Sequence, residues 1–361
     1  MSMLFTPAKL GTLSIPNRFM RSATAERMAD DQTGQPLPSL KACWQTLAEG
    51  GCGLIISGHM YVHPSGKCHP EMTAIYSDDH IAPLRALTDA VHQAGGLVAA
   101  QINHGGFQCD PQSVQAPIAP SAFLAEFIAQ PMRSMTTAEI EMLIDAYAQA
   151  ARRAKAAGFD AVQLHGAHGY LINQFISPYS NLRKDEWGGD LNSRTRFLRE
   201  ITRAVRQQVG QSYPVFIKFG MQDGLPDGLT AAEGAEVVAM MADMGLDGIE
   251  ISGGLRASNS KRGINQPDRE AYFRPLAQLA RTRTKLPIIL VGGLRSRSVM
   301  EELLESNDAD FVSLCRPFIN QPDFPNALKA GTVEISGCIS ANNCWAKNPG
   351  EGIACKCPLP E

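Results

Sequence analysis

Short apolar runs recur along the chain, and most of them lie between a Gly or Asp turn signal and a Gly, His or Ser. We interpret eight of these runs as strands. They are residues 18–22, 53–57, 97–101, 161–165, 215–218, 248–252, 288–291 and 311–314. The segments between them, such as 138–157, have an apolar residue every three or four positions, which predicts helices. Two helix starts are marked by capping boxes, formed by Thr136 with Glu139 and by Thr230 with Glu233.

The alternation of strands and helices predicts an α/β fold. Most strand runs are apolar throughout, which is typical of a parallel sheet covered by helices on both faces. Eight repeats in roughly 300 residues favour a closed (β/α)₈ TIM barrel over an open, doubly wound sheet. The longest gaps between strands predict excursions at the C-terminal face of the barrel, at 103–131 and 170–190. We expect the barrel to span residues 1–330 and a short tail that contains cysteines to span 331–361.

Charge and composition narrow the class of protein further. The 361 residues include 33 Lys and Arg against 36 Asp and Glu, and this near-balance argues against a surface built for nucleic acid or anionic lipid. No apolar run approaches the ~18 residues that cross a bilayer, and residues 1–10 lack the pattern of a secretory signal. We therefore expect a soluble, cytoplasmic protein that binds neither nucleic acid nor membrane.

Polar residues follow several of the predicted strands. In a parallel barrel the catalytic groups lie at the carboxyl ends of the strands, so these positions are candidates for a site. They are 22–25, 57–59, 101–104, 165–170, 218, 252–254, 292–293 and 315–316. The last two segments could bind phosphate through the N–H groups of Gly292 and Gly293 and the guanidinium of Arg316. Ordinary turn glycines and a surface ion pair explain the same residues equally well.

The segment His165-Gly-Ala-His-Gly-Tyr170 brings two imidazoles and a phenol to one strand end. Two neutral imidazole N–H groups could hold a carbonyl or nitro oxygen, and the Tyr170 hydroxyl could deliver a proton. His165 and His168 could instead bind zinc, although the sequence offers no third ligand nearby. They could also be hydrogen-bonded core histidines, an interpretation weakened by their position at the carboxyl end of a strand.

The sequence around this segment carries a longer block of motifs. It reads Leu-His-Gly-Ala-His-Gly-Tyr-Leu at 164–171, Gln-Phe-Ile-Ser-Pro at 174–178, Asn-Leu-Arg-Lys-Asp at 181–185, Trp-Gly-Gly at 187–189 and Asn-Ser-Arg-Thr-Arg-Phe at 192–197. This block closely resembles the old yellow enzyme family of FMN-dependent oxidoreductases. Shorter matches extend the resemblance over about residues 3–330, at 16–18, 101–104, 117–121, 158–160, 316–317 and 322–323. The resemblance implies FMN as cofactor, NAD(P)H as hydride donor, and an enone-type activated alkene or a similar small electrophile as acceptor.

The resemblance also implies roles for individual residues. Gln101 matches the glutamine that binds the pyrimidine edge of the flavin, and Lys218 stands where relatives have a cation beside flavin N1. His165 and His168 match the pair that grips the acceptor oxygen, and Tyr170 matches the proton donor. The resemblance implies that His165 also contacts the cofactor. The phosphate cradle is matched by Gly292, Gly293, Cys315 and Arg316, and the lining of the flavin ring by Ser22, Ala23, Thr24, Ala25, Gly58 and His59.

Three residues of the barrel depart from the family pattern. Ala25 stands where many relatives have a Cys or Thr that binds flavin O4, so this contact is absent or comes from elsewhere, such as Thr24. Gln163 replaces a glutamate, which removes a charge from its strand. Cys315 replaces a glycine of the phosphate loop, where only the N–H is needed.

The tail carries a further departure. The chain has nine cysteines, which favours free thiols or a metal site over a disulfide framework, and four of them lie in the last 24 residues. Cys338, Cys344 and Cys357 resemble three ligands of the [4Fe–4S] run in trimethylamine dehydrogenase and 2,4-dienoyl-CoA reductase, but the second ligand position is Ala341. We expect a degenerate site without a cluster. An unusual cluster that uses Cys355, or a zinc site, is the alternative.

Several alternatives stay open at this point. The activity could be that of a flavin-dependent amine or betaine dehydrogenase or demethylase, or the barrel could bind a phosphate-bearing ligand without redox chemistry. Lys261 and Arg262 could contact an anionic substrate or the phosphate of the nicotinamide cofactor, or belong to a solvated loop. Family members often form dimers or tetramers, but nothing here selects a homo-oligomer, the physiological acceptor, or NADH over NADPH. Loop histidines that could shape the pocket, or simply be solvated or packed, are His59, His63, His69 and His104.

Overall fold

All of the predicted strands are present in the computed structural model, which describes residues 2–123, 125, 128, 130–255, 269–346, 348 and 350–357. Each strand overlaps its predicted run. The strands are β3 (Phe19–Arg21), β4 (Leu54–Ile56), β6 (Val98–Asn103), β9 (Ala161–Gly166), β10 (Val215–Gly220), β11 (Ile249–Ser252), β12 (Ile288–Val291) and β13 (Phe311–Leu314).

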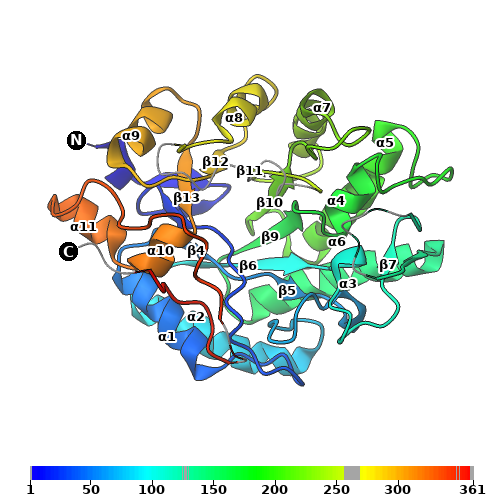
Figure 1. The fold of residues 1–361 in the computed structure, drawn as a ribbon, viewed down its shortest axis with the longest axis horizontal. Coiled ribbons are helices and arrows are strands. Elements are labelled where there is room, and N and C mark those ends of the chain that lie inside the picture. Colours follow the sequence, from blue (N-terminus) through cyan, green and yellow to red (C-terminus); the bar gives the residue numbers. More distant parts are fainter. Residues whose placement is uncertain are drawn as a thin grey trace.

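These strands close into a barrel. Each pairs in parallel with the next, and β13 returns to β3 with Val312 opposite Phe19. A further short strand, β5 (Met60–Tyr61), pairs with β6 outside this ring. Helices surround the ring on its outer side (Figure 1). The closed ring confirms the predicted (β/α)₈ barrel and excludes the alternative of an open, doubly wound sheet.

Helices begin where the capping pattern predicts. Thr136 Oγ1 accepts the N–H of Glu139, and the Glu139 carboxylate accepts the N–H of Thr136 at 2.9 Å. Thr230 and Glu233 form the same pair. The longer helices are α1 (Pro38–Glu49), α2 (Ile81–Gln93), α3 (Thr137–Ala156), α6 (Arg196–Val209), α7 (Ala231–Met241), α8 (Arg274–Arg281), α9 (Arg297–Glu305) and α11 (Phe324–Ala330). Shorter turns are η1 (Met3–Phe5), η2 (Pro64–Gly66), η3 (Asp78–His80), α5 (Leu191–Arg194) and α10 (Arg316–Asn320).

The barrel interior changes from apolar to polar along the strands. A buried apolar cluster fills the amino-terminal end, and the hairpin of β1 (Ala8–Leu10) and β2 (Leu13–Ile15) packs into it. Two residues further along a strand, the next side chain on the same face is polar. This change occurs from Ala99 to Gln101, Ala161 to Gln163, Phe216 to Lys218, Met20 to Ser22 and Phe311 to Ser313. A buried polar layer therefore lies just below the carboxyl-terminal mouth.

The two predicted excursions contain regular structure that the sequence analysis did not predict. The 170–190 segment forms α4 (Leu171–Ile176), in which every residue is buried. The 103–131 segment contains η4 (Gly106–Gln108) and β7 (Ile118–Ala119), which pairs in parallel with β8 (Arg133–Ser134). Burial explains α4, η4 and β7, whose apolar residues are packed rather than solvated, whereas β8 is exposed.

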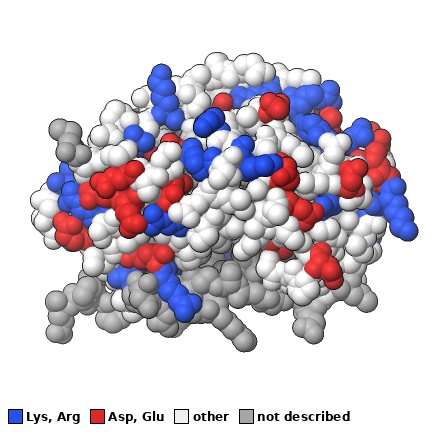
Figure 2. Space-filling view, turned by 90° about the horizontal axis from the view of Figure 1, so that it is seen from above, with Lys and Arg blue, Asp and Glu red and all other residues white. Residues whose placement is uncertain are grey.

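The surface carries charges of both signs. Figure 2 shows Lys and Arg interspersed with Asp and Glu over one face, in agreement with the near-balanced composition. In the part of the chain that the structure describes, no helix has the length and apolar character needed to cross a membrane. The candidate pair Lys261 and Arg262 lies outside the described residues.

The capping box of α3 gives a stability prediction. We expect Thr136→Ala to lower the free energy of unfolding by about 1 kcal/mol, because the N–H of Glu139 loses its acceptor. Thr137→Ala, one position further on, is the matched control, since Thr137 is exposed and is not the cap. Urea unfolding of the two variants measures the difference. Equal stability of the two variants would show that this cap contributes nothing.

Candidate active site

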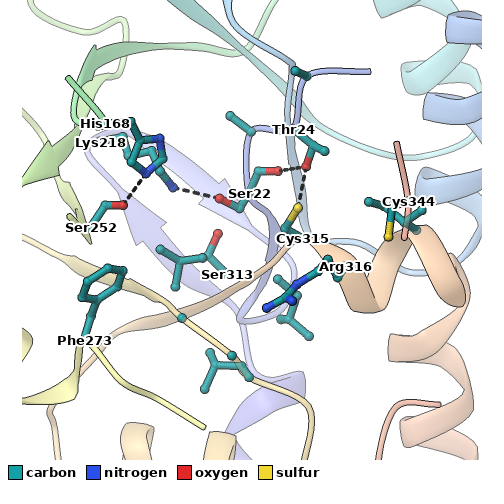
Figure 3. A pocket seen from close by; sticks show the side chains of 18 of the residues that line it. Ser22, Thr24, His168, Lys218, Ser252, Phe273, Ser313, Cys315, Arg316 and Cys344 are labelled. Carbon is teal, nitrogen blue, oxygen red and sulfur yellow. Dashed lines mark hydrogen bonds between the residues drawn. The ribbon is translucent and has the colours of Figure 1, made fainter. Parts of the chain in front are cut away.

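A cavity of about 500 Å³ lies at the carboxyl ends of the barrel strands. Figure 3 shows part of its wall, with Lys218, Ser22 and Ser313 near one another and Cys315 and Arg316 further along. Gly58 is the one predicted residue that does not line this cavity, and its N–H donates to Glu26 Oε1 at 3.0 Å. Predicted residues that do line it are Ser22, Ala23, Thr24, Ala25, His59, Gln101, His165, His168, Tyr170, Lys218, Gly292, Gly293, Cys315 and Arg316.

His165 and His168 lie close together on the cavity wall, with ring centroids 5.2 Å apart and ring planes at 83°. Burial, with His168 nearby, holds the pKa of His165 well below its usual value, so this imidazole is neutral and keeps one N–H. His168 has a φ of 59°, which residues other than glycine rarely adopt. Hydrogen bonds hold this conformation: its N–H donates to Gly253 O at 3.0 Å, and its Nε2 lies 2.8 Å from Ser252 Oγ.

Tyr170 packs against both His165 and His59, with ring centroids 4.7 Å and 5.0 Å away. Burial raises the pKa of Tyr170 well above its usual value, so the hydroxyl keeps its proton. Burial also lowers the pKa of His59 to about 4. Nδ1 of His59 accepts from Asn103 Nδ2 at 2.9 Å, which leaves the proton of the neutral ring on Nε2. Neutral imidazoles and a protonated phenol therefore share this wall.

The other loop histidines do not line the cavity. His69 packs behind His59, with ring centroids 5.6 Å apart, and burial lowers its pKa to about 2. His63 and His104 both hydrogen-bond the Ser65 hydroxyl, at 2.7 Å and 3.0 Å. These three histidines therefore support the loops above the barrel, and only His59 of the four reaches the cavity.

Lys218 at the base of the cavity forms a buried ion pair that the sequence analysis did not predict. Its Nζ lies 2.8 Å from Glu250 Oε1 and 2.9 Å from Ser22 Oγ. Burial alone would raise the pKa of Glu250, but Lys218 and the hydrogen bonds to the carboxylate hold this pKa below its usual value. Glu250 is therefore ionised, and the cation at the cavity base is paired with an anion. The available signal was a lone carboxylate within the apolar run 248–252.

The glycine pair and Arg316 form the far end of the cavity. Gly292 and Gly293 have φ of 133° and 74°. A Cβ at Gly292 would lie 3.0 Å from the Tyr272 ring, and one at Gly293 would lie 2.8 Å from a backbone oxygen, so only glycine fits without rearrangement. Arg316 lines the same end. Bare backbone beside a guanidinium suits a phosphate group.

Thr24 and Cys315 lie between the Arg316 end and the flank of the cavity. Thr24 Oγ1 donates to Ser22 O at 2.9 Å and lies 3.1 Å from Cys315 Sγ. The Thr24 hydroxyl therefore already donates its proton to a hydrogen bond within the protein. Ala25 lines the cavity beside it with no polar side-chain atom. The thiol of Cys315 is accommodated against the Thr24 hydroxyl.

The C-terminal tail closes one side of the cavity, which the sequence analysis did not predict. Arg316 Nη1 donates to Ser340 O at 3.1 Å and to Asn342 Oδ1 at 3.0 Å, so the tail is tied to the Arg316 end of the cavity. Ser340 and Asn342 both have positive φ, a backbone pattern that the sequence does not reveal. The tail residues that line the cavity are Ser340, Asn342, Cys344, Trp345 and Ile353.

The tail cysteines Cys338, Cys344, Cys355 and Cys357 are free thiols. Burial, with neighbouring thiols, raises the pKa of Cys344 to about 11. Cys355 Sγ accepts from Asn320 Nδ2 at 3.3 Å. Within the described residues, no three or more His, Cys, Asp or Glu side chains are grouped so that they could hold a metal ion.

Fold and site together define a (β/α)₈ barrel with a cavity at the carboxyl ends of its strands, and comparisons with known proteins identify its family. The family model for NADH:flavin oxidoreductases and NADH oxidases matches residues 3–334. The chain therefore belongs to the NADH:flavin oxidoreductase / NADH oxidase family. An NADPH dehydrogenase from Geobacillus sp. (strain WCH70) is 34% identical over 346 residues, which cover 95% of this chain and 99% of the relative.

Solved structures support the same assignment. The old yellow enzyme homologue from Zymomonas mobilis is 27% identical, has a TM-score of 0.78, and is matched over 93% of this chain and 95% of its own. The histamine dehydrogenase from Rhizobium sp. 4-9 is also 27% identical, with a TM-score of 0.82, over 91% of this chain and 48% of its own. The resemblance to the old yellow enzyme family is thus confirmed. The chain spans 52% and 51% of the length of two further curated relatives.

The buried imidazoles predict a pH dependence of stability. Because the pKa of His59 is about 4 in the folded protein and 6.5 ordinarily, the unfolded state binds more protons in this window. The free energy of unfolding should therefore fall as the pH drops from about 6.5 to 4, by about 3 kcal/mol for His59. We expect His59→Asn to flatten this part of the curve, measured by urea unfolding at a series of pH values. The same slope in both proteins would contradict this assignment.

Proposed function

We propose that the protein is an FMN-dependent oxidoreductase that takes hydride from NAD(P)H and reduces an activated alkene, such as an enone. The observation that carries this proposal is the juxtaposition of the neutral His165 imidazole, His168, protonated Tyr170 and the Lys218 cation around one cavity. The family membership and the NADPH dehydrogenase relative support the redox class.

The residues around the cavity fit FMN. Gly292, Gly293 and Arg316 would hold its phosphate, Gln101 the pyrimidine edge of its ring, and Lys218 the side where reduction leaves negative charge. When bound, FMN supplies the two-electron carrier that accepts hydride from NAD(P)H and returns it to the acceptor. The protein's own contribution is orientation, charge and the exclusion of water.

The acceptor-binding residues are the two histidines and the tyrosine. His165 and His168 would donate hydrogen bonds to the carbonyl oxygen of an enone and thereby polarise its double bond, each donor lowering the barrier by a few kcal/mol. Tyr170 would hold the proton that the α-carbon receives, which contributes about 10² to 10⁴ in rate. Its raised pKa keeps this proton available at neutral pH.

The proton donor gives a direct test. Tyr170→Phe should slow reduction of an enone by about 10² to 10⁴, because the α-carbon loses its donor, and should leave reduction of the cofactor by NADPH near the wild-type rate. Stopped-flow absorbance measures the two half-reactions separately. Tyr76→Phe is the control, because its ring packs on Tyr61 and His80. Equal losses in both half-reactions would count against Tyr170 as the donor.

A second candidate function is amine oxidation, which the similarity to the histamine dehydrogenase structure supports. The groups on the cavity wall favour alkene reduction, because imidazole N–H donors suit an acceptor oxygen better than an ammonium group.

Anaerobic mixing separates the two functions. We expect NADPH to bleach the bound cofactor, and histamine or trimethylamine to leave its absorbance unchanged when NADPH is absent. Bleaching by an amine alone, at a rate comparable to that with NADPH, would make amine oxidation the better assignment.

A further inference from the structure

Glu250 is a carboxylate that is completely buried beneath the cavity and bound by four donors. Oε1 accepts from Lys218 Nζ at 2.8 Å, Ser22 Oγ at 2.7 Å and Ser313 Oγ at 2.9 Å. Oε2 accepts from Gln163 Nε2 at 2.8 Å. Lys218 lines the cavity, whereas Glu250 lies behind it, so any action of Glu250 on a ligand passes through its partners.

The carboxylate fixes the direction of the two neighbouring amides. An ionised carboxylate only accepts hydrogen bonds, so Gln163 must turn its nitrogen toward Glu250 and its carbonyl toward Gln101. Gln101 must then donate its Nε2 to Gln163 Oε1, at 2.6 Å. Gln101 is left with its carbonyl Oε1 for the cavity that it lines, and no hydrogen bond within the described residues uses this oxygen.

We propose that Glu250 is a positioning residue for the cofactor, acting through Gln163 and Gln101 on one side and through Lys218 on the other. Through the amides it makes Gln101 an acceptor for the imide N–H of a flavin ring. Through the ion pair it offsets the charge of Lys218, so that the reduced, negatively charged ring is stabilised less than by an unpaired lysine. This inference rests on the proposed function, in which FMN occupies the cavity.

The first test is Glu250→Gln. Because the ammonium of Lys218 only donates, the new amide turns its carbonyl to Lys218 and its nitrogen to Gln163. Gln163 and Gln101 then both reverse, and Gln101 presents its NH₂ group to the imide N–H. We expect FMN to bind about tenfold more weakly to the apoprotein. We also expect the midpoint potential of bound FMN to rise by about 30 mV, which equals a tenfold change in a two-electron equilibrium.

The exchange Gln163→Glu/Glu250→Gln is the matched control, because it keeps the net charge. The carboxylate at 163 accepts from both neighbouring amides, so Gln101 regains its wild-type direction. FMN affinity should therefore return to near the wild-type value. The potential should stay raised, because the anion no longer contacts Lys218.

Several results would overturn the proposal. If Glu250→Gln keeps the wild-type FMN affinity and midpoint potential, Glu250 has no positioning role. If the exchange variant binds FMN no better than Glu250→Gln, the hydrogen-bonded relay from Glu250 through Gln163 to Gln101 does not exist. If Glu250→Gln does not fold, Gln163→Met cuts the relay and keeps the Lys218–Glu250 contact. It should weaken FMN binding without moving the potential, and unchanged binding rejects the relay. Wild-type protein that binds no FMN rejects the proposed function itself.

Discussion

The buried ion pair between Lys218 and Glu250 is the interaction on which the site depends. The two residues face each other in the register of β10 and β11, inside the barrel. A buried charge pair is tolerated only when further hydrogen bonds offset the loss of hydration. Ser22, Ser313 and Gln163 supply these bonds. The pair therefore ties β3, β9, β10, β11 and β13 into one polar layer at a defined depth.

This layer determines what the mouth of the barrel can do. Below it the interior is apolar and filled, so a ligand must lie across the strand ends. Above it, neutral imidazoles and a protonated tyrosine form one wall, and bare glycine backbone with Arg316 forms the far end. The hydrogen bond from the His168 N–H to Gly253 O holds the positive φ of His168, so the barrel fixes the orientation of this imidazole.

Much of this arrangement could be predicted from the sequence. The eight apolar runs predicted the strands, the capping boxes predicted the starts of α3 and α7, and the block around His165 predicted the family. Glu250 was missed because a lone charge in an apolar strand reveals its importance only when the closed barrel brings Lys218 to it. In the tail, the sequence shows only the cysteine pattern. The contacts of the tail with Arg316 depend on backbone conformations at Ser340 and Asn342 that have no sequence signature.

A crystal structure of the protein with FMN tests the central claim most directly. The account predicts the phosphate against Gly292, Gly293 and Arg316, and the ring over Lys218 with Gln101 Oε1 facing its imide N–H. A phosphate bound elsewhere, or a ring that does not contact Gln101 and Lys218, would contradict it.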